Sequence, residues 1–199
     1  SHLQRLLQRH GAELFDEPAA IADCTIVQSF LRPYEKPSSR GKSTLSICVR
    51  LGLGDPGRSV VLYCKLFLEG RSEAAWQRLE KSPGQVGNAA ATWIGALDMI
   101  VWRFPHDPRI RHLPQAVVVS NARQHLPCHR LPTPLGSDPV ELTIEPVKYL
   151  PEKCCTSIYR LRSGAQSATL YGKTYSDDRG RSIYRRIERF HRTGLFKLP

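Results

Sequence analysis

The chain has 199 residues, which suits one sizeable domain or two small ones. Hydrophobic residues make up 41% of it, enough for a packed core, yet no apolar run approaches the ~20 residues of a membrane-spanning helix, so we expect no membrane partner. The formal net charge of +11 favours anionic partners such as nucleic acid, phosphorylated ligands or acidic surfaces, and leaves the choice among them open.

The cysteines suggest reduced thiols rather than disulfides or a metal site. No CxxC pair is present, and cysteines in strand-like segments behave as small buried hydrophobes. His125, Cys128 and His129 form the only metal-like cluster, and no further ligands at suitable spacing are evident, so we expect no metal site. Reduced thiols are typical of a cytoplasmic protein, which is the location we expect.

Residue patterns in the first part of the chain predict alternating helices and strands. In chain order they are a helix, three strands, a helix and a further strand, over residues 3–15, 23–31, 44–51, 59–68, 70–82 and 99–104. The Asp55-Pro56-Gly57 sequence predicts a turn that makes the second and third strands a hairpin.

A proline-rich segment precedes a second run of similar patterns. Residues 124–138 read as a linker because prolines and turn-forming residues cluster there. After it the patterns predict three strands and a helix, over residues 140–150, 153–163, 167–175 and 180–192.

The second run resembles the first, which indicates an internal repeat. KSTLSICVR is similar to KCCTSIYRL, and LYCKLF is similar to LYGKTY. Eleven residues separate Lys65 from Trp76, and eleven separate Lys173 from Tyr184. We therefore predict an α+β fold of two antiparallel strand–strand–strand–helix units, each sheet covered by a helix. Residues 1–123 would form a cap or structural unit, 124–138 the linker, and 139–199 the second unit.

Each repeat carries a lysine between aromatic neighbours on a strand. Alternation places Lys173 on one face with Tyr171 and Tyr175. Such a lysine needs no ligand, because its stem can cover apolar surface while its ammonium reaches water or lies over a ring. The order of two strands, a lysine strand and a helix with Glu188 is nevertheless that of a kinase ATP lobe. There a fixed cation contacts the nucleotide phosphates and a carboxylate holds it in position.

The second unit resembles the N-terminal part of aminoglycoside-phosphotransferase-like small-molecule kinases. Those proteins carry a pattern of the form RYxPxRRCxxRY followed by a strand with KxY, and here KYLPEKCCTSIYRL precedes GKTY. Upstream, WRFPHDPRIRHLP is similar to a segment of the form W-x-FP-x-D-x-x-L that precedes that lobe in some members. The resemblance covers roughly residues 101–199 and, more loosely, the first repeat.

The resemblance implies a kinase N-lobe-like second unit that binds ATP with magnesium, in a protein whose partners are a nucleotide and a small-molecule acceptor. Lys173 would match the phosphate-contacting lysine and Glu188 its helix partner. The turn with Pro151, Glu152 and Lys153 would match the loop that covers the phosphates, although it contains no glycine.

The catalytic half of such kinases has no counterpart in this sequence. Phosphoryl transfer by their mechanism needs a catalytic-loop Asp with an Asn a few residues later, and no Asn follows Asn121. The one His-Asp pair, His106-Asp107, precedes the lobe and is followed by proline. We therefore predict no catalytic residue and expect a non-catalytic fragment or relic of a phosphotransferase. Lys65 would belong to a duplicated scaffold.

The last predicted helix leaves a second function open. Arg181, Arg185, Arg189 and Arg192 recur at helical spacing, while Ile183, Ile187 and Phe190 form the opposite face. A basic stripe can follow a phosphate backbone, so a nucleic-acid-binding or protein-interaction module is the alternative. No DNA or RNA recognition motif is present, and a solvated helix face would give the same pattern.

Overall fold

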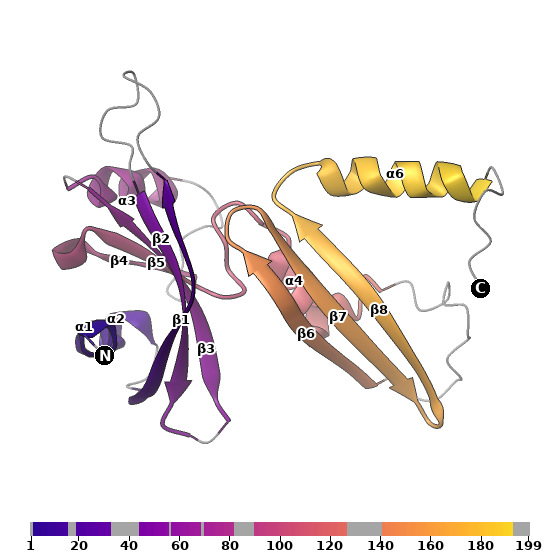
Figure 1. The fold of residues 1–199 in the computed structure, drawn as a ribbon, viewed down its shortest axis with the longest axis horizontal. Coiled ribbons are helices and arrows are strands. Elements are labelled where there is room, and N and C mark those ends of the chain that lie inside the picture. The colour runs from indigo at the N-terminus through magenta and orange to yellow at the C-terminus, as the bar shows by residue number, and fades with distance from the viewer. Residues whose placement is uncertain are drawn as a thin grey trace. The chain divides into compact units, whose positions relative to one another are not determined.

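A computed structural model describes residues 2–15, 19–32, 44–55, 57–68, 70–81, 90–126 and 141–192. Packing divides the chain into two units, Ser1–Pro108 and Arg109–Pro199 (Figure 1). The sequence placed residues 109–123 with the first unit, whereas the helices in this segment contact the first strand of the second. Most of the predicted linker, residues 127–138, lies outside the described residues.

The first unit is built on a five-stranded antiparallel sheet with the strand order β1-β2-β3-β5-β4. Its elements are α1 (His2–Arg9), α2 (Gly11–Leu14), β1 (Ile21–Arg32), β2 (Thr44–Leu53), β3 (Ser59–Phe67), α3 (Ser72–Glu80), β4 (Ala91–Ile94), the 3-10 turn η2 (Gly95–Leu97) and β5 (Met99–Arg103). The predicted first helix is interrupted at His10, and β4 was not predicted from the sequence.

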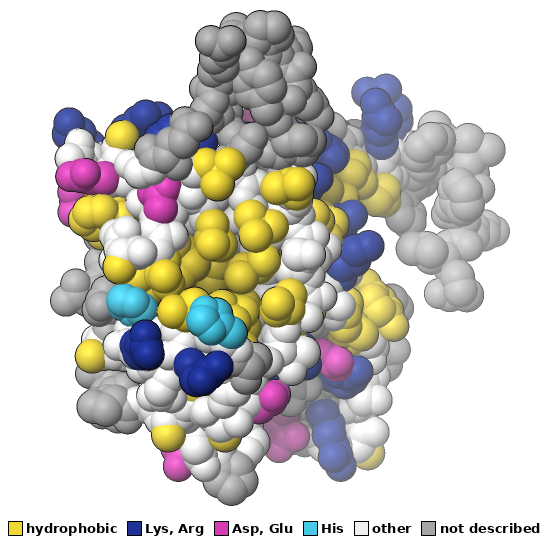
Figure 2. All heavy atoms as spheres, turned by 60° about the vertical axis from the view of Figure 1, so that its left-hand side comes forward, with side chains coloured by type: hydrophobic (Ala, Val, Ile, Leu, Met, Phe, Trp, Pro, Cys, Tyr) yellow, Lys and Arg dark blue, Asp and Glu magenta, His cyan; other side chains and the backbone are white. Residues whose placement is uncertain are grey.

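The core of this unit includes the face of the sheet that packs against α1. Val49 on β2 and Leu62 on β3 are register partners, and both are fully buried on the face that also buries Leu7 of α1. The side chain of Gln8 holds α1 against β1, because its carbonyl oxygen accepts the backbone N–H of Ile21 at 2.7 Å. Figure 2 brings forward the left-hand side of Figure 1, and on that surface hydrophobic side chains gather next to histidine, lysine and arginine side chains.

Asp98 holds the start of α3. Its carboxylate accepts backbone N–H groups from Gly70 at 2.9 Å and Ser72 at 2.7 Å. Partial burial acts to raise the pKa of this carboxyl, but the hydrogen bonds from Ser72, Gly70 and Arg71 outweigh it and lower the pKa. Asp98 has a φ of 46°, in the left-handed region that Asp and Asn adopt more readily than most residues.

The second unit contains a three-stranded antiparallel sheet with the order β6-β7-β8. Its elements are α4 (Leu113–Val117), α5 (Val119–Ala122), β6 (Glu141–Leu150), β7 (Cys154–Ser163), β8 (Gln166–Tyr175) and α6 (Arg179–Arg192). The sequence did not predict α4 or α5, where three successive valines and a serine give weak helix signals. The predicted α+β class, with antiparallel sheets, is confirmed.

The helix that covers the second sheet differs from the one that the repeat suggests. Ala122 of α5 packs in a buried cluster with Leu142, Tyr159 and Leu161 of the sheet. By contrast, every side chain of α6 from Arg181 to Arg189 is exposed. Within the described ranges, no helix is long and apolar enough to cross a membrane.

Candidate functional site

Lys173 lies on β8, one of the two outer strands of the second sheet as described, and its side chain is exposed. Its register partner on β7 is Thr156, and Tyr171 and Tyr175 share its face, as the sequence predicted. The opposite face of β8 belongs to the core side, where Gly172 lies against Tyr159. A Cβ atom on Gly172 would come within 2.6 Å of that ring, so the close approach requires glycine.

Two cations lie close to the ring of Tyr175. The ammonium nitrogen of Lys173 is 5.1 Å from the ring centroid, and the guanidinium carbon of Arg179 is 5.9 Å from it. Arg179 also forms an ion pair with Asp177 at 3.1 Å. Cation–π contact therefore holds Lys173 beside the β8–α6 connection without neutralising its charge.

Lys148 of β6 joins Lys173 on this face through a β-bulge. Strict alternation would put Lys148 on the core side with Leu142 and Ile144, but the register shifts between Pro146 and Lys148. Lys148 consequently pairs with Thr156, the residue that also pairs with Lys173. Sequence reasoning missed this residue, and the one available signal was Pro146, because proline within a strand marks edges and bulges.

The predicted phosphate-covering turn lies next to the end of β8. The backbone N–H of Ser176 donates to the carbonyl oxygen of Lys153 at 3.0 Å, which joins the β6–β7 turn to the β8–α6 connection. Lys153 is exposed, whereas Pro151 and Glu152 are buried. Glu152 has a φ of 59°, so the turn adopts a glycine-like conformation at a residue with a buried carboxyl side chain.

Glu188 is not paired with Lys173: among the described residues, the structure records no ion pair between them. Gly180 at the start of α6 lies near Tyr175, 3.2 Å from a ring carbon if a Cβ atom is placed on it. An α-helix rises about 1.5 Å per residue, so Glu188 lies about 12 Å farther along the axis. Glu188 is exposed there.

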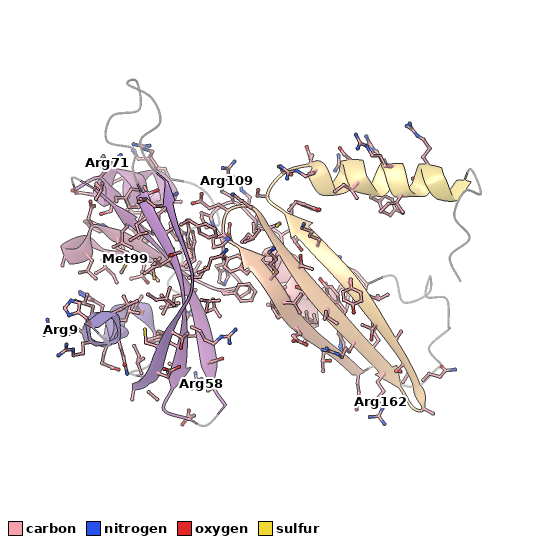
Figure 3. The ribbon with its side chains drawn as sticks, in the orientation of Figure 1. Arg9, Arg58, Arg71, Met99, Arg109 and Arg162 are labelled. Carbon is pink, nitrogen blue, oxygen red and sulfur yellow. The ribbon has the colours of Figure 1, made fainter. Side chains whose placement is uncertain are left out.

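Helix α6 exposes both of its predicted faces. The arginines at 181, 185 and 189 are exposed, and so are Ile183, Tyr184 and Ile187, with exposed fractions of 38%, 56% and 50%. The side chains of Phe190 and Arg192 lie outside the described residues. In Figure 3 several nitrogen-tipped side chains of α6 point away from the strands.

The first repeat places its lysine in a different environment. Lys65 is half-buried on β3, a central strand, and its ammonium nitrogen lies 5.9 Å from the centroid of the Phe67 ring. Tyr63, on the same face, stacks on Trp102 with ring centroids 5.2 Å apart. On the helix that follows, the carboxylate of Glu80 accepts a hydrogen bond from the indole of Trp76 at 2.8 Å.

Other groups in the described residues are weaker candidates for a functional site. Cys24, Cys48, Cys64, Cys154 and Cys155 are free thiols. Burial, with a smaller contribution from Asp107, raises the pKa of Cys48 to about 12, so this thiol is a poor nucleophile. Across the described ranges no three His, Cys, Asp or Glu side chains gather to hold a metal ion; His125 is described, whereas Cys128 and His129 are not. A hollow lined by His2, Arg5, Leu6 and Arg9 involves α1 alone.

A comparison of the chain with known protein families, curated proteins and solved structures finds no match.

Proposed function

We propose that the chain supplies a cap and part of the ATP-binding lobe of a small-molecule phosphotransferase and does not itself catalyse phosphoryl transfer. The observation that carries this proposal is the exposed Lys173, held by Tyr175 beside a turn that is hydrogen-bonded to the β8–α6 connection. A cation fixed at such a place suits an ATP phosphate, because catalysis in this class depends on positioning and on charge.

The residues around Lys173 would accommodate the phosphates of ATP better than they would hold a magnesium ion. Lys173 and Lys153 are exposed cations, and Asp177 on the β8–α6 connection is paired with Arg179. The described residues offer no cluster of metal ligands, so magnesium would arrive coordinated by ATP and be held chiefly by its phosphates. The free thiols suit a reducing compartment, so a cytoplasmic location belongs to the proposal.

Thermal unfolding with and without ATP and magnesium tests the proposal. ATP should raise the melting temperature of the wild-type chain, and Lys173→Ala should remove the shift. Lys65→Ala is the matched control, because it removes the equivalent lysine of the first repeat and should leave the shift in place. No shift at millimolar ATP, or equal loss in both variants, would contradict the proposal.

The exposed arginines of α6 favour a second candidate function, binding of a nucleic-acid backbone. A helix with Arg181, Arg185 and Arg189 exposed could contact several phosphates, and such binding weakens steeply with salt. Retention of a single-stranded oligonucleotide should then fall sharply between low and moderate salt and depend on these arginines. Retention that is unchanged by salt would exclude this function.

A further inference from the structure

The register of the second sheet aligns two lysines and a threonine in one row. Thr156 of the central strand β7 pairs with Lys148 on one side and with Lys173 on the other. Neighbouring strands lie about 4.8 Å apart, so the Cα atoms of the two lysines are about 10 Å apart. Their side chains leave the same face of the sheet, and Thr156 lies between them on that face.

The charges of this row are not neutralised by neighbouring carboxylates. Within the described part of the chain, neither Lys148 nor Lys173 has an ion-pair partner. Glu145, which pairs with Ile158 in the next row on the same face, is bound to Arg160 at 2.6 Å. Asp177, on the connection after β8, is bound to Arg179 at 3.1 Å. The row therefore carries two positive charges, and both Glu145 and Asp177 are already paired with arginines.

We propose that Lys148, Thr156 and Lys173 form a binding site for the phosphate chain of a condensed phosphate, with Lys148 as its second cation. The proposal rests on the proposed function, because it extends the site around Lys173. Two flexible ammonium groups on opposite sides of a hydroxyl suit a chain of linked phosphates better than a single small anion. We expect the β6–β7 turn to contribute less to phosphate binding than the lysines do. In this turn Glu152 places a carboxyl group where a glycine-rich loop would present only backbone N–H groups.

Edge strands offer a simpler role for the same residues. Both β6 and β8 are outer strands of the sheet, and lysines on such strands discourage edge-to-edge association. That role requires only positive charge on each edge. A phosphate site requires both lysines together, so the two roles predict different behaviour of single variants.

Titration calorimetry of the full chain with inorganic tripolyphosphate separates these possibilities. Lys148→Ala and Lys173→Ala should each weaken binding about tenfold, as expected when one charge-assisted contact is lost. Arg162→Ala is the matched control, because it removes one exposed cation from the same face of β7. Figure 3 shows Arg162 at the opposite end of the sheet from α6. This variant should bind as the wild type does, and Lys148→Arg should retain binding.

The outcomes of these titrations test the proposed site of Lys148, Thr156 and Lys173 separately from the proposed ATP-binding function. If Lys173→Ala weakens binding of both tripolyphosphate and ATP while Lys148→Ala weakens neither, the three-residue site is ruled out and the proposed function stands. Equal small losses of affinity in all three alanine variants would reveal a general effect of positive charge, and would also rule out the three-residue site. No binding of either ligand at millimolar concentration would overturn both proposals. Unchanged melting temperatures should accompany the lysine variants, because both side chains are exposed.

Discussion

Lys65 and Lys173 follow the same local pattern, and their surroundings differ. Each ammonium lies near the aromatic ring two residues farther along its strand, as expected for side chains on one face. Lys65 is half-buried on a strand with neighbours on both sides, whereas Lys173 is exposed on an outer strand. Contact with a ring therefore does not separate a structural lysine from a binding one, and exposure of the ammonium to a ligand becomes the deciding property.

At the residue scale, Asp98→Asn should destabilise the first unit by about 1 kcal/mol at neutral pH, because the cap at α3 loses its charged acceptor. The folded state lowers the pKa of Asp98, so its stabilisation is fully present above the ordinary carboxyl pKa and is lost as the pH falls through the folded-state value. Urea unfolding at pH 7 and near pH 3 measures both effects, and the difference from the wild type should shrink in acid.

Asp55→Asn is the control for this experiment. Asp55 lies in a turn with its side chain 78% exposed, and its ion pair with Arg58 spans 3.5 Å, so its charge should contribute little. An Asp98→Asn variant that is as stable as Asp55→Asn at pH 7 would show that the charged cap is unimportant.

At the scale of elements, the strands that alternate clearly were predictable, and the irregular features were not. The strands predicted over residues 44–51 and 153–163 correspond to β2 and β7, because apolar and polar side chains alternate or β-branched residues cluster there. The bulge after Pro146 moves Lys148 to the other face, and alternation alone cannot reveal an inserted residue. The pairing of α5 with the second sheet also escaped prediction, because it depends on contacts between distant segments.

Helix α6 allows a direct test of what stabilises the second unit. Ile187 is half exposed, so Ile187→Ala should change the free energy of unfolding by less than about 0.5 kcal/mol. Leu161, 1% exposed in the buried cluster, provides the contrast: Leu161→Ala should cost about 2–5 kcal/mol. Denaturant unfolding followed by far-UV circular dichroism compares the two. A large loss in Ile187→Ala would mean that α6 packs against the unit in solution.

At the scale of the whole molecule, the chain consists of two units, and the buried clusters that the structure describes in them differ in size. The described core of the first unit includes a cluster of twelve buried residues, and the cluster in the second includes four. The sequence predicted the repeat of strand, strand, lysine strand and helix in both. It did not predict that β5 would add to the lysine strand of the first unit, while β8 pairs with β7 alone among the described strands.

This difference predicts separate unfolding of the two units. Trp76, Trp93 and Trp102 are the three tryptophans of the chain, and all belong to the first unit. Because the buried cluster described in the second unit is the smaller one, we expect this unit to unfold at lower urea, so circular dichroism should change before tryptophan fluorescence does. Coincident transitions from both probes would contradict this order and show a single cooperative unit.

The most direct test of the central claim, that Lys173 contacts a nucleotide phosphate, is a nuclear magnetic resonance titration of the isotope-labelled chain with ATP and magnesium. We predict that shifts of the backbone amides cluster at Lys148, Thr156 and Lys173 and at the adjoining turn, and that the amide of Lys65 does not shift. Shifts confined to the first unit or to α6, or no shifts at millimolar ATP, would contradict it.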